Sequence, residues 1–157
     1  MLALNSPVMQ QGFFYAGNSS AHGEFRALCP IEGGVVIGPD SLIRTIREIE
    51  RLSAQGLQHG DAASAVAQES AKRLLSEAQM DRPIYVIPSA IEASEGDLLI
   101  HWDTATKSVV LICPASTTKP AQIYREVLDG RRAIHSEMVE ASSHSLSSAL
   151  AWVLRAK

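Results

Sequence analysis

The sequence is poor in the residues that metal centres and disulfide frameworks require. It has two cysteines, Cys29 and Cys113, with no Cys-x-x-Cys spacing and no histidine pattern that would complete a four-ligand zinc site. We therefore predict no metal and no cofactor. Both thiols are expected to be free and buried in a reducing cytoplasm.

Long hydrophobic runs and basic clusters are also absent from the sequence. No apolar stretch reaches the roughly 20 residues that cross a bilayer, and the N-terminus lacks the positive start of a secretory signal. The 14 Lys and Arg residues are outnumbered by 17 Asp and Glu, and the densest basic group is Arg131 with Arg132. The sequence therefore predicts a cytoplasmic protein without a membrane segment, and it does not favour nucleic-acid binding.

Motifs for nucleophilic catalysis and for phosphate binding are missing as well. No serine stands in a Gly-x-Ser-x-Gly elbow. Gly33, Gly34 and Gly38 precede a predicted helix, but the lysine of a phosphate-binding loop does not follow them. We predict no catalytic residues, and a non-enzymatic role is favoured over an enzymatic one.

What remains is a globular composition that follows an irregular beginning. Hydrophobic residues make up 46% and charged residues 20% of the 157 positions, which suits one domain with one core. Residues 1–38 show no sustained period and are predicted to form an irregular N-terminal arm before a single domain, 39–157. Phe13, Phe14 and Tyr15 of the arm are predicted interface residues, because aromatic side chains dominate interface anchors.

Two segments after the arm have helical spacing. In the first, Leu42, Ile46 and Ile49 follow a helix start at Asp40, and Gly56 is the predicted C-terminal cap. The second is predicted to open at Asp61 and to stop before Pro83. Its apolar stripe consists of Ala63, Val66, Ala67, Ser70, Leu74 and Ala78. The short link between the segments favours an antiparallel helix pair.

After Pro83 the period becomes that of strands. Alternating and β-branched residues predict strands within 84–93, 98–103, 107–113, 121–128 and 131–139. The predicted connections include a short loop, 104–106, and a hairpin turn at Asp129-Gly130. A C-terminal helix with Ser143 or Ser145 as its cap is indicated by Leu146, Ala149, Leu150, Val153 and Leu154. The prediction is an α+β fold with two N-terminal helices, an antiparallel meander of about five strands, and a C-terminal helix on one sheet face.

A histidine and a carboxylate stand beside a tryptophan in the second predicted strand. Ile100 and Trp102 share the face predicted to be core, while His101 and Asp103 share the other face with Leu99. A His-x-Asp pair suits metal binding or acid–base chemistry, but a metal site needs at least a third ligand. A similar pair occurs further along the chain, so the candidate ligand-binding residues are His101, Asp103, His135 and Glu137. The alternative is a structural role at the sheet rim.

The second sheet face is predicted to be apolar too. It is expected to hold Leu99 together with Val109 and Leu111, or with their neighbours, depending on the strand register. The arm, another subunit or a ligand must cover such a patch. We therefore expect a homodimer with these residues at its interface. The favoured function is a non-enzymatic protein-interaction or accessory module that self-associates. The alternative is a small-ligand binder or weak hydrolase that uses the His101 and Asp103 side of the sheet.

Residues 40–157 also follow a recognisable order: a helical half, a Pro-led strand, a Gly turn, a strand ending in Trp, an alternating strand ending in Pro, and a helix with Trp. The matching residues are Pro88, Gly96, Leu98, Ile100, Trp102, Val110, Ile112, Pro114 and Trp152. This order resembles that of small bacterial orphan α+β proteins of unassigned function. The chain departs from them at residues 115–119, where they have an acidic-Gly turn. The resemblance implies the α+β fold and a partner encoded nearby, and it brings no catalytic residues.

Overall fold

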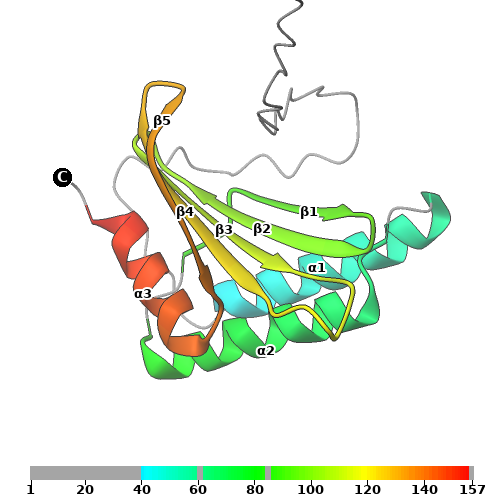
Figure 1. The fold of residues 1–157 in the computed structure, drawn as a ribbon. Helices are drawn as coiled ribbons and strands as arrows, with labels where there is room; N and C mark the ends of the chain where they lie inside the picture. Colours follow the sequence, from blue (N-terminus) through cyan, green and yellow to red (C-terminus); the bar gives the residue numbers. More distant parts are fainter. Residues whose placement is uncertain (1–39, 60–61, 84–85, 156–157) are drawn as a thin grey trace, which may run out of the picture.

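The structure, a computed structural model, describes residues 40–59, 62–83 and 86–155 (Figure 1). These residues form helices α1 (Asp40–His59) and α2 (Ala65–Asp81), strands β1 (Ala90–Ser94), β2 (Asp97–Asp103), β3 (Lys107–Cys113), β4 (Gln122–Asp129) and β5 (Arg132–Glu140), and helix α3 (Ser143–Leu154). The predicted α+β fold is confirmed. The predicted arm, with Phe13, Phe14 and Tyr15, lies outside the described residues.

The strands form one antiparallel sheet in the order β1-β2-β3-β4-β5, so each strand pairs with its neighbours in sequence. Glu95 and Gly96 join β1 to β2 with φ angles of 53° and 87°, the left-handed backbone of a two-residue hairpin turn. The β4–β5 turn is one residue later than predicted. Asp129 pairs with Arg132, and Gly130 has a φ angle of 60°, so Gly130 and Arg131 form the turn.

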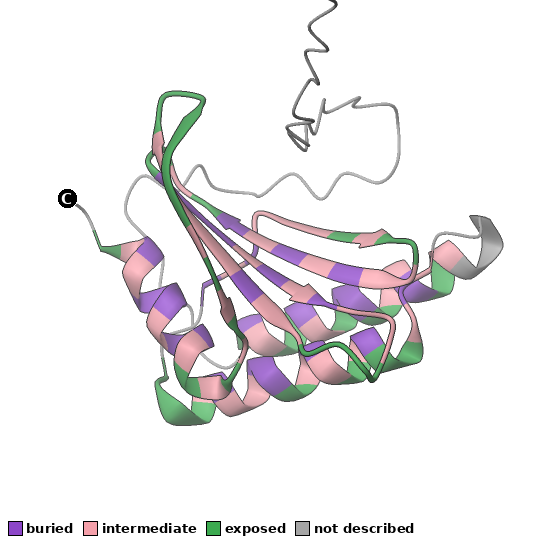
Figure 2. Cartoon of the chain, viewed as in Figure 1, coloured by how far each residue is buried: buried purple, intermediate pink, exposed green. Residues whose placement is uncertain are grey.

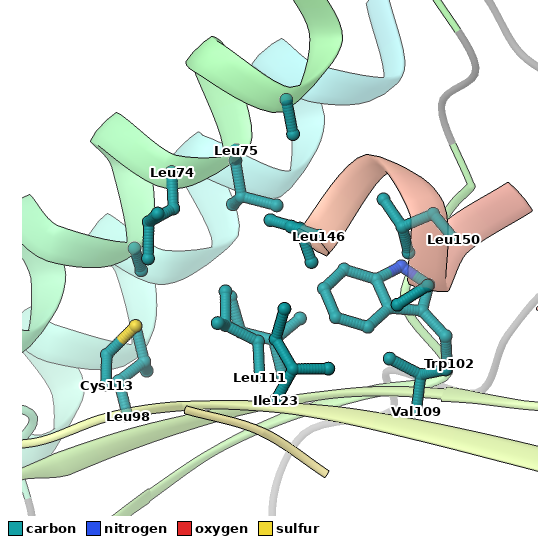
Figure 3. Packing of buried hydrophobic residues seen from close by; sticks show 14 of the residues in the cluster. Leu74, Leu75, Leu98, Trp102, Val109, Leu111, Cys113, Ile123, Leu146 and Leu150 are labelled. Atoms are coloured by element: carbon teal, nitrogen blue, oxygen red, sulfur yellow. The ribbon is translucent and has the colours of Figure 1, made fainter. Parts of the chain in front are cut away.

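Helices α1, α2 and α3 all lie on one face of the sheet (Figure 1). Between them and the strands, side chains from α2 (Leu74, Leu75) and α3 (Leu146, Leu150) pack against Trp102 and the buried residues of β2 to β4 (Figure 3). Trp102 is 1% exposed, and its Nε1 donates a 2.9 Å hydrogen bond to the carbonyl oxygen of Val86. The prediction that Trp102 and Ile100 lie in the core is therefore confirmed. No described helix is both long and apolar enough to cross a bilayer.

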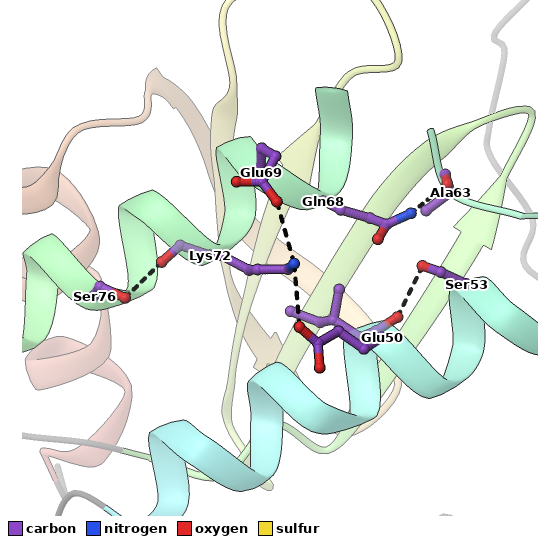
Figure 4. A network of polar contacts seen from close by, with 8 residues as sticks. Glu50, Ser53, Ala63, Gln68, Glu69, Lys72 and Ser76 are labelled. Atoms are coloured by element: carbon purple, nitrogen blue, oxygen red, sulfur yellow. Dashed lines mark hydrogen bonds and ion pairs between the residues drawn. The ribbon is translucent and has the colours of Figure 1, made fainter. Parts of the chain in front are cut away.

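The first two helices run antiparallel, as predicted, and an ion-pair network joins them (Figure 4). Lys72 Nζ on α2 lies 3.3 Å from Glu50 Oε1 on α1 and 3.2 Å from Glu69 Oε1 on its own helix. Exposed ion pairs of this kind contribute little stability each, about 0–1 kcal/mol. They link the two helices on their exposed side and add little to the stability of the fold.

The ends of both helices differ from the prediction. Helix α1 continues through Gly56 to His59, so Gly56 is not its cap. Helix α2 begins after Ser64 rather than Asp61, because Ser64 Oγ accepts the N–H of Ala67 at 3.1 Å. The Ser64 N–H is itself tied to the carbonyl oxygen of Gly96 at 2.8 Å, which fixes the helix start against the β1–β2 turn.

Two further boundaries were predicted imperfectly. The first strand starts only at Ala90, since Val86 and Pro88 are buried ahead of it without strand pairing. The N-cap of α3 is Ser142, one residue before the predicted range. Its Oγ accepts the N–H of Ser145, and Ser145 Oγ accepts the N–H of Ser142, which forms a reciprocal capping box.

The register of β2 with β3 corrects the predicted second face. A three-residue loop would pair Asp103 with Lys107, but Asp103 pairs with Ser108 and Trp102 with Val109. A shift of one residue moves every side chain of a strand to the other face. Val109 and Leu111 are accordingly 0% exposed on the core face, so their predicted place beside Leu99 is wrong.

Candidate functional site: the open face of the sheet

The sheet has a second face, opposite the three helices, that no described element covers (Figure 2). We call it the open face. Strand alternation and register assign to it the side chains of Ala90, Glu92, Ser94, Asp97, Leu99, His101, Asp103, Ser108, Val110, Ile112, Gln122, Tyr124, Glu126, Leu128, Ala133, Ser136, Met138 and Glu140.

Asp103 is held by two serines. Its Oδ2 accepts a 2.7 Å hydrogen bond from Ser89 Oγ, and its Oδ1 accepts a 2.6 Å bond from Ser108 Oγ. Ser89 also donates its backbone N–H to the carbonyl oxygen of His101 at 2.7 Å. The carboxylate therefore joins the segment before β1 to β2 and β3. This arrangement matches the structural alternative considered for Asp103.

His101 lies in the middle of the open face, opposite Val110 on β3 and Ala90 on β1. Its Nε2 is buried and has no hydrogen-bond partner among the described residues, and Glu92 Oε2 is 3.8 Å away. A half-buried imidazole beside a carboxylate suits recognition of a polar group. Acid–base catalysis also needs a reacting partner within hydrogen-bond reach.

The four predicted ligand-binding residues do not come together. The register runs from Val109 through Arg125 to Glu137, which places Glu137 and His135 on the helix side of the sheet. His101 and Asp103 point to the open face. Glu137 forms an ion pair with Arg125, and His135 Nε2 lies 4.0 Å from Glu137 Oε2. The four candidate residues are therefore divided between the two faces of the sheet.

The structure instead places Leu99 in a row of apolar side chains with Val110 and Ile112, the neighbours of the predicted Val109 and Leu111. Leu99 lies opposite Ile112, and Val110 lies opposite His101 on one side and Tyr124 on the other. These side chains are only partly shielded by one another. The alternation on β3 separates Val109 and Leu111 from Val110 and Ile112. Because both sets are apolar, the sequence did not show which set faces the helices.

Carboxylates surround this apolar row. Glu92, Asp103, Glu126 and Glu140 occupy open-face positions, and among the described strand residues no lysine or arginine does. Tyr124 Oη donates a 2.9 Å hydrogen bond to Glu126 Oε2. Burial raises the pKa of Tyr124, and this bond to Glu126 raises it further, so the phenol remains a neutral donor. The open face therefore has an apolar centre and an acidic surround.

The described residues offer little chemistry for a reaction. They contain no group of three or more His, Cys, Asp or Glu side chains placed to hold a metal ion. The Cys113 thiol lies in the core, where burial raises its pKa to about 12, so it is not a thiolate at neutral pH.

Comparison of the chain with protein-family models, with curated proteins and with solved structures gives no match. The described structure has the small α+β architecture that the resemblance to orphan proteins implied.

Proposed function

We propose that the protein is a non-enzymatic interaction module that self-associates and binds a second protein through the open face of its sheet. The observation that carries this proposal is the row of Leu99, Val110 and Ile112, which lies opposite the helices and is covered by no described element. An apolar patch rimmed by polar groups is typical of a protein interface.

The charges on the open face favour a particular kind of partner. Because Glu92, Glu126 and Glu140 surround the apolar row without a described Lys or Arg among them, complementarity calls for apolar side chains ringed by basic ones. The same carboxylates would repel the phosphates of a nucleic acid. A partner encoded nearby, as the resemblance implies, fits this proposal. We retain a cytoplasmic location, which the free buried thiol of Cys113 supports.

The alternative function, a small-ligand binder or weak hydrolase, retains only part of its proposed site. His101 keeps an unbonded Nε2 on the open face, while Asp103 is engaged by Ser89 and Ser108. Ligand binding at His101 is therefore the form of the alternative that the geometry favours. A small polar ligand that shifts the NMR signals of His101 but not of Ile112 would support it.

Site-specific photocrosslinking in the source cells tests the partner. A photoreactive residue at Val110 is expected to crosslink one protein of basic character, whereas the same residue at Met80, exposed on α2, is not. Crosslinking of the same proteins from both positions, or of none from Val110, would contradict binding through the open face.

Self-association is tested separately by light scattering. The full chain is expected to show twice its 16.9 kDa mass at tens of micromolar. A monomer mass across that range would contradict the self-association part of the proposal.

A further inference from the structure

Strand β5 forms one edge of the sheet, and no described strand pairs with its outer side. The side chains of its first five residues are all exposed, and most of the strand is exposed in Figure 2. Ile134 and Met138 are 57% and 53% exposed, so two large apolar side chains of this strand face solvent. An edge strand with unpaired backbone groups can accept another strand. The opposite edge, β1, is shorter and contacts α1.

We propose that β5 pairs antiparallel with β5 of a second copy, about a two-fold axis at Ser136. This inference rests on the proposed self-association and names its surface. The argument comes from the order of side chains along Arg132–Glu140, which is complementary to its own reverse.

With the axis at Ser136, His135 of one copy lies opposite Glu137 of the other, and this pair occurs twice. Ile134 lies opposite Met138, also twice, so the two exposed apolar side chains cover each other. Opposite charges and apolar pairs placed directly across antiparallel strands are stabilising. The sequence of β5 therefore provides both charge and apolar complementarity for its own copy.

Other axis positions are less favourable. In an antiparallel pair, two residues that lie opposite each other either both point their backbone N–H and C=O groups at the partner strand or both point them away. In a symmetric pair the two-fold axis must therefore lie between two copies of the same residue. An axis at Glu137 puts two carboxylates opposite each other, and an axis at His135 puts two imidazoles together. An axis at Met138 leaves Glu137 opposite Val139. Of these positions, Ser136 alone satisfies both the charged and the apolar side chains.

A β-bulge limits the length of this pairing. Val127 pairs with His135 and Leu128 with Ala133, so Ile134 is the additional residue of β5. Bulges and charges on edge strands keep them from pairing with any other strand they meet. In β5 the bulge at Ile134 leaves regular strand geometry from His135 onward. We expect the His135–Glu137 pairs at the centre of the contact and the Ile134–Met138 contacts at its rim.

The short contact predicts a weak, concentration-dependent dimer, at the low end of specific interfaces, below about 1,200 Å² in total. The two-fold axis is perpendicular to the sheet, since paired residues keep to the same face. The helices of both copies therefore lie on one side, and the two open faces lie on the other. Pairing through β5 would give a second protein one continuous surface of twice the width.

Two double variants of the full chain test the register. Ile134→Lys with Met138→Lys puts lysine opposite lysine twice, and is expected to weaken the dimer by about tenfold or more. Ile134→Lys with Met138→Glu puts lysine opposite glutamate twice, and is expected to stay within about threefold of the parent. Both positions are exposed, and melting temperatures equal to that of the parent would verify that both variants fold. Equal dimerisation of the two variants would overturn the register.

A disulfide tests the axis itself. In a chain with Cys29→Ser, so that buried Cys113 is the other thiol, Ser136→Cys is expected to crosslink to its own copy under mild oxidation. Opposite Cβ atoms lie about 4.5–5.5 Å apart, near the reach of a disulfide. The matched control is Ser94→Cys, exposed on the opposite edge strand β1, where no crosslink is expected.

The possible failures are distinguishable. A monomeric parent overturns both this inference and the proposed self-association. A dimer that is unaffected by the charge variants and does not crosslink at position 136 overturns the β5 pairing alone. A monomer whose β5 amides are nevertheless protected from hydrogen exchange would assign the edge to another segment of the same chain, and would also overturn the pairing.

Discussion

The ammonium group of Lys107 on β3 lies 3.0 Å from the carbonyl oxygen of Trp152 and 2.6 Å from that of Arg155, at the C-terminal end of α3. Its Nζ is also 5.0 Å from the centre of the Trp152 ring. The last carbonyl groups of a helix lack partners within the helix, and a cation there is stabilised by the helix dipole. Lys107 is buried, so these contacts replace the water that its charge loses. A strand residue thus attaches α3 to the sheet.

Lys107→Met is therefore expected to destabilise the fold by about 1–3 kcal/mol, because it removes the charged donor to the carbonyl oxygens of Trp152 and Arg155. The loss should be concentrated in the last turn of α3, where hydrogen exchange would become faster. Lys119→Met, at an exposed loop position, is the matched control. Equal unfolding midpoints for the two variants in urea would contradict the anchoring role.

Trp102→Ala should cost about 3–5 kcal/mol, the range for removing a buried aromatic side chain. The variant also leaves the carbonyl oxygen of Val86 without the indole donor. Trp102→Phe keeps an aromatic ring and loses this hydrogen bond, so it should cost less. Urea unfolding followed by circular dichroism measures both, and a Trp102→Ala variant within a few tenths of a kcal/mol of the parent would be incompatible with the core described above.

The Arg125–Glu137 pair makes stability depend on acid pH. The hydrogen bond from Arg125 holds the pKa of Glu137 below its ordinary value of 4.5, with the charges of Arg125 and His135 acting in the same direction. A carboxyl group whose pKa is depressed by folding contributes stability above its unfolded pKa, and that stability is lost as the pH falls through the folded pKa.

Arg125→Gln should therefore lower the melting temperature at neutral pH and flatten its decline below about pH 4.5. The measurement is the melting temperature of both proteins from pH 7 to pH 2. Glu140→Gln, on the same strand as Glu137 and without an ion pair in the described structure, provides the control. If the melting temperatures of the parent and of Arg125→Gln fell in parallel as the pH was lowered, the ion pair would not contribute to the loss of stability in acid.

Alternation was enough to predict the faces of β2, because one of its rows is Leu98, Ile100 and Trp102 while the other contains His101 and Asp103. On β3 both rows are apolar, so the loop decides the face. The N–H of Thr104 donates to the carbonyl oxygen of Lys107 at 2.8 Å, and Thr104 Oγ1 accepts the N–H of Lys107 at 3.0 Å, so Thr104 and Lys107 close the turn and Asp103 pairs with Ser108.

The faces of His135 and Glu137 were harder still to predict. They depend on a register carried across the polar loop 114–121, where no alternation exists, and their neighbour Ile134 forms a bulge. The ends of α1 and α2 were missed for a different reason. Gly56 is tolerated inside a helix, and Ser64 outcompetes Asp61 as the cap because its backbone is fixed by Gly96.

Zinc should leave the melting temperature unchanged. His101 and Asp103 are two candidate ligands on the open face, and Asp103 already accepts hydrogen bonds from Ser89 and Ser108. A metal at a hundred times its dissociation constant would add about 2.7 kcal/mol, which is easily detected in a thermal melt. Stabilisation by zinc that disappears in His101→Ala would refute this prediction and favour the ligand-binding alternative.

The order of strands in the sheet, identical to their order in the chain, also bears on how the molecule folds. Each hairpin needs only the closure of a short local loop, so each pairing step loses little chain entropy. The contacts that span longer stretches of chain are those of α1, α2 and α3 with the strands. Domains rich in local contacts fold faster than those dominated by distant ones. Folding of this chain should therefore be limited by the docking of its helices onto the meander.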